Sequence, residues 1–327
     1  MAHYIGVDLH KAFCQVCAVE ADGTRAWERR YPTTVAGLAT LSAQCGATAR
    51  VAVEASGPTW WFVDQVRPHV QAVVVVDAGR TRLKAGYAAK TNRLDAYRLA
   101  DALRRDSVVA VWYPPPALRD LRELSRYRIS LVRTATTLRQ RLRALLLRQG
   151  VTVRAADLSS PSATAALQQV ALPGWAARGG QGLHALLGEV LTRLAPIDAA
   201  VTDAGHADPI VRALETLPGI GVILGVTIRA EVGAIERFPS PRHLASYAGL
   251  VPRVSGTGDR IHYGAITKRG SAWLRWALVE AAIHGTRRRD RTGRWARGVA
   301  LRRGRLKARI AIARALCTEI YRTWPRG

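Results

Sequence analysis

Acidic residues in three short stretches of the chain have the types and settings that a metal-dependent nuclease requires. Asp8 and Glu54 lie within or just after short aliphatic runs that predict buried strands. Asp95 lies at the start of a long helical pattern, three residues after Asn92, so the two share one helix face. Carboxylates beside buried strands are costly unless a partner compensates their charge, and a divalent cation is the usual one. The sequence predicts a Mg²⁺ or Mn²⁺ site formed by Asp8, Glu54, Asn92 and Asp95.

Each acid also has an ordinary structural interpretation. A lone Asp on a strand is commonly a turn or capping residue, and Glu54 precedes Ser56-Gly57-Pro58, which is typical of the lead into a helix. Asp95 fits a first-turn acid favoured by the helix dipole. Asp101 cannot replace Asn92, because at about 100° per residue it points to the opposite side of the helix. The metal-site hypothesis therefore depends on all of these positions together.

The elements that would position these acids alternate between strand and helix patterns. The sequence predicts helices over 34–45 and 58–68 and one beginning near Thr91, and it predicts six strands, over 3–9, 13–19, 25–31, 50–54, 71–76 and 107–112. Pro114-Pro115-Pro116 ends this region. A mixed sheet with flanking helices follows, which fits a ribonuclease-H-like domain over 1–113 or a generic three-layer α/β domain.

A long helical pattern follows the prolines and runs to Gln149. Its apolar residues are spaced in heptads, at Leu124, Leu131, Leu138 and Leu145 in one seam and Leu121, Ala135 and Leu142 in the second, which Arg128 interrupts. Two interpretations stay open for this arm over 114–150: a coiled coil used in self-association, or a long helix packed on its own domain.

The remainder is a helical connector over 151–205 and a C-terminal domain over 206–327. Leu217-Pro218-Gly219-Ile220-Gly221 lies between two helical patterns and resembles a helix-hairpin-helix turn, in which glycines allow tight geometry and expose amide groups to a phosphate. A plain helix–helix turn is the alternative.

Charge is strongly positive and unevenly distributed. The chain has 327 residues and a net charge of +25. Residues 1–113 hold 14 basic and 10 acidic side chains, whereas the 61 residues from Thr267 onward hold 17 and 3. A mildly charged first half and a strongly basic end indicate a catalytic core joined to a nucleic-acid-binding region.

Together these features resemble the DEDD-type insertion-sequence transposases, the family that includes the pilin-inversion recombinase and the bridge-RNA recombinases. Asp8, Glu54 and Asp95 match three of the family's four acids, and Asn92 takes the place of the fourth in a segment similar to the family's K-T-D-x-x-D-A. The resemblance implies a RuvC-like N-terminal domain and a mainly α C-terminal transposase domain.

The C-terminal landmarks of the resemblance are Tyr247-Ala248-Gly249-Leu250-Val251-Pro252 and Gly264-Ala265-Ile266-Thr267-Lys268-Arg269-Gly270. Between them the family carries a serine followed by glycine, thought to attack a DNA phosphate. Counting without gaps places Thr257 there, and threonine retains a nucleophilic hydroxyl. Ser255 is the second candidate, because residues two apart in an extended loop face the same way. A flexible turn with no chemistry is the alternative.

Basic side chains are expected to bind the nucleic-acid backbone. The candidates are Lys90, Arg253, Arg260, Lys268, Arg269, Arg287, Arg288, Arg289, Arg302, Arg303 and Arg305.

The leading hypothesis is a DNA transposase or site-specific recombinase that uses Mg²⁺. The resemblance implies that it acts on element ends and target DNA, with sites built from two subunits of a homodimer or tetramer and with a structured guide RNA. Two alternatives are a nucleic-acid-binding relative that has lost its chemistry, motivated by Asn92 and Thr257, and a RuvC-like junction endonuclease, which needs no C-terminal hydroxyl. The start of the chain lacks a signal-peptide pattern and no apolar run approaches a membrane span, so a cytoplasmic, nucleoid-associated protein without a membrane partner is expected.

Overall fold

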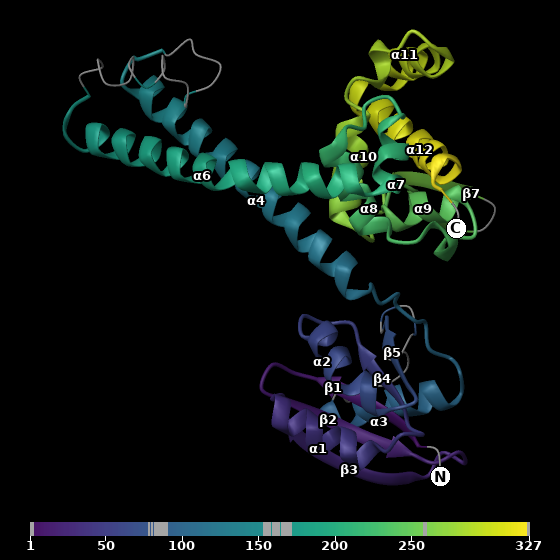
Figure 1. Cartoon of the computed structure of the whole chain (residues 1–327). Helices are drawn as coiled ribbons and strands as arrows, with labels where there is room; N and C mark the ends of the chain where they lie inside the picture. The colour runs from purple at the N-terminus through teal and green to yellow at the C-terminus, as the bar shows by residue number, and fades with distance from the viewer. Residues whose placement is uncertain are drawn as a thin grey trace. The chain divides into compact units, whose positions relative to one another are not determined.

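The computed structural model describes residues 3–77, 79, 81, 91–152, 158, 164, 172–257 and 260–325. The chain divides into two compact units, unit 1 over Met1–Pro114 and unit 2 over Pro115–Gly327 (Figure 1). Among the described residues, no helix combines the length and apolar character needed to cross a membrane. The finer divisions expected at residues 150 and 205 stay predictions.

Unit 1 is built on a five-stranded sheet in the order β3-β2-β1-β4-β5. Strand β1 pairs antiparallel with β2, which pairs antiparallel with β3, whereas β4 is parallel to both β1 and β5. The strands are β1 (Tyr4–Leu9), β2 (Phe13–Val19), β3 (Arg25–Pro32), β4 (Arg50–Glu54) and β5 (Ala72–Val76). The first five predicted strands are confirmed.

Helices cover both faces of this sheet (Figure 1). Helices α1 (Val35–Cys45) and α2 (Thr59–Val66) pack on the face that carries Val7, Val51 and Val53. A short 3-10 turn, η1 (Arg67–His69), follows α2. Helix α3 (Asn92–Arg104) packs on the other face, where Ala52 meets Leu99. Because side chains alternate between the two faces of a strand, Ala52 faces α3, whereas Val51 and Val53 face α1 and α2.

Local sequence sets where the helices of unit 1 begin. Thr34 and Thr91 have extended backbones, and each accepts a hydrogen bond from the amide three residues on, at Gly37 and Leu94. Such capping satisfies one of the amides that a helix N-terminus leaves without a partner. The helices expected over 34–45, 58–68 and from Thr91 are confirmed.

The strand predicted over 107–112 is wrong. This segment forms only an isolated antiparallel bridge, between Val76 and Ala110. The amide of Val109 donates to the Thr81 side chain, 3.0 Å away, so it is not available to a sheet ladder. The β-branched residues of this segment favour a strand, but this side-chain bond and the prolines that follow limit regular pairing.

Unit 2 is mainly helical, as expected. It contains two long helices, α4 (Pro116–Arg148) and α6 (Gly174–Ala207), a two-stranded hairpin of β6 (Pro252–Thr257) and β7 (Arg260–Ile266), and shorter helices. These are α7 (Pro209–Glu215), α8 (Val222–Val232), η2 (Ile235–Arg237), α9 (Pro241–Tyr247), α10 (Ala272–Ala281), η3 (Gly285–Arg287), α11 (Arg291–Arg303) and α12 (Arg305–Thr323). Leu217–Gly221 is the turn between α7 and α8, with Gly219 at a positive φ of 91°.

Residues of both heptad seams of α4 pack within its own unit. Ala135, Leu138, Leu142 and Leu146 pack with Leu187 of α6. Nearer its start, Leu121 and Leu124 pack against residues of α6, α7 and α8. Arg128, which interrupts the second seam, donates to Asp198 of α6 over 2.6 Å. The long helix is confirmed and packs on its own unit, and its use in self-association stays a prediction.

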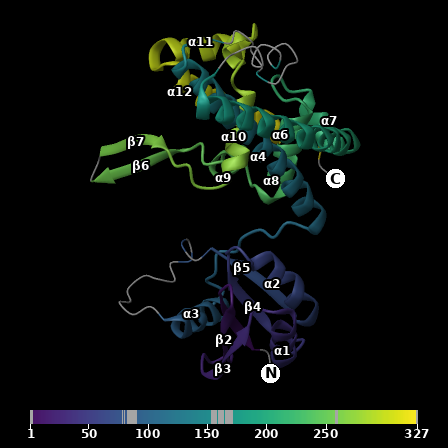
Figure 2. The same ribbon diagram turned by 90° about the vertical axis from the view of Figure 1, so that its left-hand side faces the viewer.

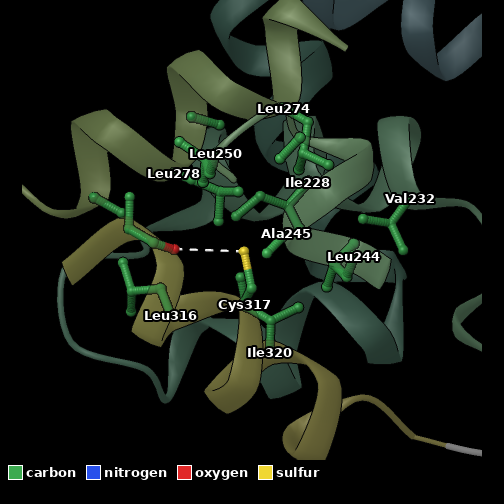
Figure 3. Packing of buried hydrophobic residues seen from close by; sticks show 14 of the residues in the cluster. Ile228, Val232, Leu244, Ala245, Leu250, Leu274, Leu278, Leu316, Cys317 and Ile320 are labelled. Carbon is green, nitrogen blue, oxygen red and sulfur yellow. Dashed lines mark hydrogen bonds between the residues drawn. The ribbon is translucent and has the colours of Figure 1, made fainter. Parts of the chain in front are cut away.

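The main core of unit 2 lies among α8, α9, α10 and α12. Figure 3 shows Ile228, Leu244, Leu278 and Ile320 converging there. Cys317 lies among them and donates to the carbonyl of Ala313 over 3.4 Å. Burial raises the pKa of this thiol to about 12, so the residue behaves as a small apolar side chain.

A buried polar network joins α4 to α8 and α10. Arg126 donates from Nε and Nη2 to Oε1 of Glu231, over 2.9 and 2.7 Å, and Ser271 Oγ donates to Oε2 over 2.8 Å. Arg122 donates to the backbone carbonyls of Ala230 and Glu231. The Glu231 side chain is only 3% exposed. Its charge is therefore compensated inside the protein, and sequence reasoning did not find it.

Candidate active site

The two strand acids lie on one face of the unit 1 sheet. In the parallel pair β1–β4, Gly6 is opposite Ala52 and Val7 is opposite Val53. Side chains alternate along a strand, so Asp8 shares the face of Gly6, and Glu54 shares the face of Ala52. This is the face on which α3 packs. Both acids occur at the carboxyl ends of their strands.

Helix α3 runs antiparallel to β1. Arg104, at its C-terminal end, donates to the carbonyl of Ala21 in the turn after β2, and β2 ends with Val19 opposite Tyr4 at the start of β1. The first turn of α3, which contains Asp95, therefore lies toward the Asp8 end of β1. This is the side of the sheet that the metal-site hypothesis requires.

Gly6 allows this close approach of helix and strand. A Cβ atom built on Gly6 would lie 2.0 Å from the carbonyl oxygen of Ala96 and 2.4 Å from the amide nitrogen of Ala100. Any larger residue would displace α3 from the sheet. The glycine in Gly6-Val7-Asp8 thus positions Asp95 relative to the strand acids.

Two of the acids have a basic partner. His10 Nε2 lies 3.0 Å from Asp8 Oδ2, and Arg98 Nη1 lies 3.3 Å from Asp95 Oδ1. The Asp8 and Asp95 side chains are 16% and 21% exposed. Across the described parts of the chain, no three His, Cys, Asp or Glu side chains are grouped closely enough to hold a metal ion. Asn92, the first residue of α3, is exposed.

The donor chemistry nevertheless suits a hard cation. Asp8, Glu54 and Asp95 present carboxylate oxygens from three elements on one face, and Asn92 adds an amide oxygen, and Mg²⁺ and Mn²⁺ prefer such ligands. The Arg98 guanidinium compensates part of the negative charge in this conformation, and the His10 ring lies within hydrogen-bond distance of Asp8. The residue types at this edge of the sheet therefore suit a divalent cation.

The structural interpretations of these acids also find support. Helix α2 begins at Thr59, soon after Glu54, and Thr59 Oγ1 donates to the Glu54 carbonyl over 2.8 Å. Asp95 is the acid in the first turn of α3. The local roles of these residues do not exclude a metal site. The local roles concern the backbone and the helix ends, whereas a metal site would use the side-chain carboxylates on the shared face of the sheet.

The loop predicted to hold the hydroxyls of Ser255 and Thr257 is a β-hairpin. Strands β6 (Pro252–Thr257) and β7 (Arg260–Ile266) pair antiparallel, and Figure 2 shows this hairpin extending from the helices of unit 2. The sequence expectation of a loop here is corrected. The signal was present as alternation between polar and apolar residues along Arg253-Val254-Ser255, but Gly256 and Gly264 weaken the strand pattern.

The hairpin has two chemically different faces. Ser255 is paired with His262 and Val254 with Tyr263. Cross-strand partners share a face, so Ser255 and His262 lie on one and Val254 and Tyr263 on the other. All four are exposed, Val254 by 61% and Tyr263 by 72%. Thr257 is paired with Arg260 near the end of the hairpin, and its side chain, the first candidate nucleophile, lies outside the described residues.

The structure separates the predicted nucleic-acid-binding residues into groups. Lys90 lies outside the described residues, and so does the side chain of Arg260. Arg288 is bonded within the protein, to Asp290 over 2.6 Å and to Glu319 over 3.7 Å. The others are exposed: Arg253, Lys268, Arg269, Arg287, Arg289, Arg302, Arg303 and Arg305.

Comparison with known proteins covers both units. Residues 5–149 match the model of DEDD transposases of the IS110 type, described as "Transposase". Residues 211–296 match the model described as "Transposase IS116/IS110/IS902 family". The chain belongs to the DEDD-type insertion-sequence transposase family. The first match contains Asp8, Glu54 and Asp95, and the second contains the β6–β7 hairpin.

Individual transposases are similar over most of this chain. The transposase for insertion sequence element IS1111A of Coxiella burnetii is 28% identical over 94% of this chain and 86% of its own length. A probable family 20 transposase of Pseudomonas aeruginosa is 28% identical over 80% of each chain. The putative transposase y4qE of Sinorhizobium fredii is 32% identical over 69% of this chain and 56% of its own length.

Proposed function

We propose that this transposase cleaves and rejoins DNA strands of an insertion sequence in a Mg²⁺-dependent reaction, through a hydroxyl nucleophile on the β6–β7 hairpin. The observation that carries the proposal is the occurrence, in order along one chain, of matches to both transposase models, one around the acids and one around the hairpin. Family membership implies a RuvC-like fold for unit 1, and the sheet with parallel β1, β4 and β5 supports it.

The acids of unit 1 would hold the metal. Asp8, Glu54 and Asp95 are the charged ligands and Asn92 is a neutral oxygen ligand. When bound, the ion supplies a Lewis acid that stabilises developing negative charge on a phosphate. His10 contacts Asp8 and Arg98 contacts Asp95, so these two contacts would have to shift when the ion binds.

The hairpin hydroxyl would form a transient bond with DNA. Its oxygen attacks the phosphorus, one phosphoester bond forms while a DNA phosphoester bond breaks, and the hydroxyl proton passes through solvent to the leaving DNA oxygen. The reverse reaction with another DNA hydroxyl rejoins the strand, so no external energy source is needed. Thr257 is the first candidate and Ser255 the second.

Partners follow from the same proposal. The transposase would bind element ends and target DNA through exposed basic residues such as Arg253, Lys268 and Arg269. A structured guide RNA and a homodimer or tetramer with sites built from two subunits are further parts of the proposal, implied by the family resemblance.

A binding-only protein is the second candidate function. Asn92 stands where the family has an acid and Thr257 where it has a serine, and both departures fall on predicted reacting positions. The basic partners of Asp8 and Asp95 also suit a protein in which these carboxylates have become structural.

A recombination assay on DNA that carries the element's own ends, with Mg²⁺, tests the proposal. Asp8→Asn should lower the rate on the order of 10²–10³-fold, because losing several kcal/mol of metal-dependent stabilisation corresponds to that factor. Asp106→Asn is the matched control: it removes an exposed acid at φ 52°, where asparagine is tolerated, and should leave the rate unchanged. Inactive wild type with intact DNA binding would favour the binding-only function.

Hairpin variants identify the nucleophile. Thr257→Ala should abolish both recombination and the protein–DNA adduct seen on a denaturing gel, whereas Ser255→Ala should retain them. The opposite result would assign the attack to Ser255. Strand cleavage that survives both substitutions would indicate hydrolysis by water, as in a junction endonuclease.

A further inference from the structure

A cavity in unit 2 lies where η3 meets α12 and the residues after α10. Its volume is about 340 Å³, within the range typical of small-ligand sites. Among the described residues, seven line it: Ala282, Ile283, Thr286, Arg287, Arg305, Arg309 and Ile312. Three of these seven carry a guanidinium group and none carries a carboxylate.

The chain builds this cavity through a close packing contact. Gly285 in η3 lies against Ile312 of α12, and a Cβ on Gly285 would come within 2.7 Å of the isoleucine side chain. Arg297 of α11 donates to the carbonyls of Thr286 and Arg288, over 3.0 and 2.8 Å. These contacts hold η3 on α12 from two sides, so Thr286 and Arg287 have a fixed backbone next to the helix.

The first turns of α12 supply the other two arginines. Arg305 is the first residue of this 19-residue helix and Arg309 follows four positions later, so both project from one face. The helix N-terminus adds partial positive charge to the same place. Arg309 is half-buried, whereas Arg305 and Arg287 are exposed.

Neighbouring arginines show what sets these three apart. Arg288 is paired with Asp290 and Glu319, and the same network holds the pKa of Asp290 low, through the amide of Gly293 first and Arg288 second. In the described part of the chain, Arg305 and Arg309 form no ion pair with a carboxylate, and Arg287 contacts His284 at 3.4 Å. Positive charge gathered in a concave site without acidic partners favours an anion.

The lining also restricts which anion fits. Ala282, Ile283 and Ile312 form an apolar wall beside the guanidinium groups. A bare inorganic ion would not use this wall, but a sugar and base attached to a phosphate would. Thr286 adds a hydroxyl beside the guanidinium groups, so the described lining offers donors to a phosphate and an apolar surface to a nucleoside.

We propose that this cavity binds one nucleotide unit of a DNA strand. Arg287, Arg305 and Arg309 bind the phosphate, and the apolar wall contacts the nucleoside. The naming of DNA rests on the proposed function, whereas the phosphate site itself depends only on the cavity. The site is distinct from the β6–β7 hairpin, so it anchors the strand and takes no part in bond breaking.

Calorimetric titration of the full chain with thymidine 3′,5′-bisphosphate tests this assignment. Saturable binding at one site per chain is expected, and Arg309→Gln should weaken it at least about tenfold, the effect of losing one charge-assisted contact of about 1.5 kcal/mol or more. Arg322→Gln removes the same charge from the exposed last turn of α12 and should change the affinity less than about twofold. Circular dichroism of both variants checks that the helices remain folded.

Other ligands separate the remaining outcomes. Thymidine without phosphates should bind at least about tenfold more weakly, since it lacks the charged contacts. Tighter binding of uridine 3′,5′-bisphosphate than of the thymidine compound would overturn the assignment to DNA. Equal effects of Arg309→Gln and Arg322→Gln, or no saturable binding, would overturn the site. Because no strand is cut in this experiment, inactivity in recombination would leave its result unaffected.

Discussion

The carboxylates of the two units differ in how many of their hydrogen-bond acceptor sites are occupied by protein groups. Glu231 in unit 2 is 3% exposed and receives hydrogen bonds from Arg126 and Ser271 on both of its oxygens. Asp8 and Asp95 in unit 1 are several times more exposed, and each contacts one basic side chain among the described residues. All three lie beside apolar sequence, so their sequence settings are alike.

The difference separates structural acids from acids available to a ligand. A carboxylate whose lone pairs are filled by an arginine and a hydroxyl has no capacity left for a metal ion, whereas one with a single contact retains acceptor sites. Asp8 and Asp95 also share the α3 face of the sheet with Glu54, and Glu231 has no such companion in its network. The number of occupied acceptor sites and the position of the acid in the fold together distinguish structural acids from acids available to a ligand.

The strongest test of this comparison is Glu231→Gln. The change removes the negative charge facing Arg126 inside unit 2, and breaking a buried ion pair costs about 3–5 kcal/mol. We expect the lower end of that range, because Arg126 is 33% exposed and can recover some hydration. Hydrogen exchange of α8 peptides, read by mass spectrometry, reports the opening free energy of unit 2 alone.

Glu236→Gln provides the control for this variant. Glu236 is exposed in η2, so its neutralisation should change the free energy by less than about 0.5 kcal/mol. If Glu231→Gln were equally harmless, Glu231 would not be a structural acid and the comparison would fail.

Gly6→Ala sharpens the comparison from the side of unit 1. The added methyl group would meet the α3 backbone at 2.0 Å, so the helix must shift, at a cost of about 1–3 kcal/mol. Because α3 carries Asp95, recombination should fall further than the lost stability explains. Peptide exchange of β1 and α3, measured beside the recombination rate, separates the two effects.

Gly57→Ala is the matched change in the same unit. A Cβ on Gly57 meets nothing within 4 Å, and φ there is not positive. Stability and rate should both stay near wild type. A Gly6→Ala protein that recombines normally despite the displaced helix would show that Asp95 need not lie near β1.

Sequence reasoning located the acids of unit 1 because their positions depend on local rules. Strand alternation and helix periodicity place Asp8, Glu54 and Asp95 on elements whose bounds follow from short patterns. The same rules do not identify Glu231. Its partner Arg126 lies 105 residues earlier in the chain, and no local pattern indicates which arginine a buried glutamate meets.

The basic residues show the same limit. Arg287 and Arg288 are adjacent in one basic run, so the sequence does not distinguish them. In the structure Arg287 lines a cavity, whereas Arg288 forms ion pairs with Asp290 and Glu319. Arg309, half-buried in that cavity, belongs to no run and was missed. Tertiary contacts decide whether an arginine binds a ligand or supports the fold, and composition reports only the total.

Asn92→Asp tests the smallest difference, the absent fourth acid. Asn92 is exposed at the first position of α3, so an aspartate there should stabilise the helix N-terminus by about 0.3–1 kcal/mol whether or not a metal binds. If position 92 is a ligand, a second effect follows: the Mg²⁺ concentration that gives half-maximal recombination should fall about threefold to tenfold, because a charged oxygen replaces a neutral one.

Asn92→Ala distinguishes these two effects. It removes the side-chain oxygen, so it should raise the half-maximal Mg²⁺ concentration and place asparagine between alanine and aspartate in a graded series. Helix capping alone would alter stability without moving the Mg²⁺ dependence. Identical Mg²⁺ dependence in all three proteins would show that residue 92 makes no metal contact, and the candidate site would then consist of Asp8, Glu54 and Asp95.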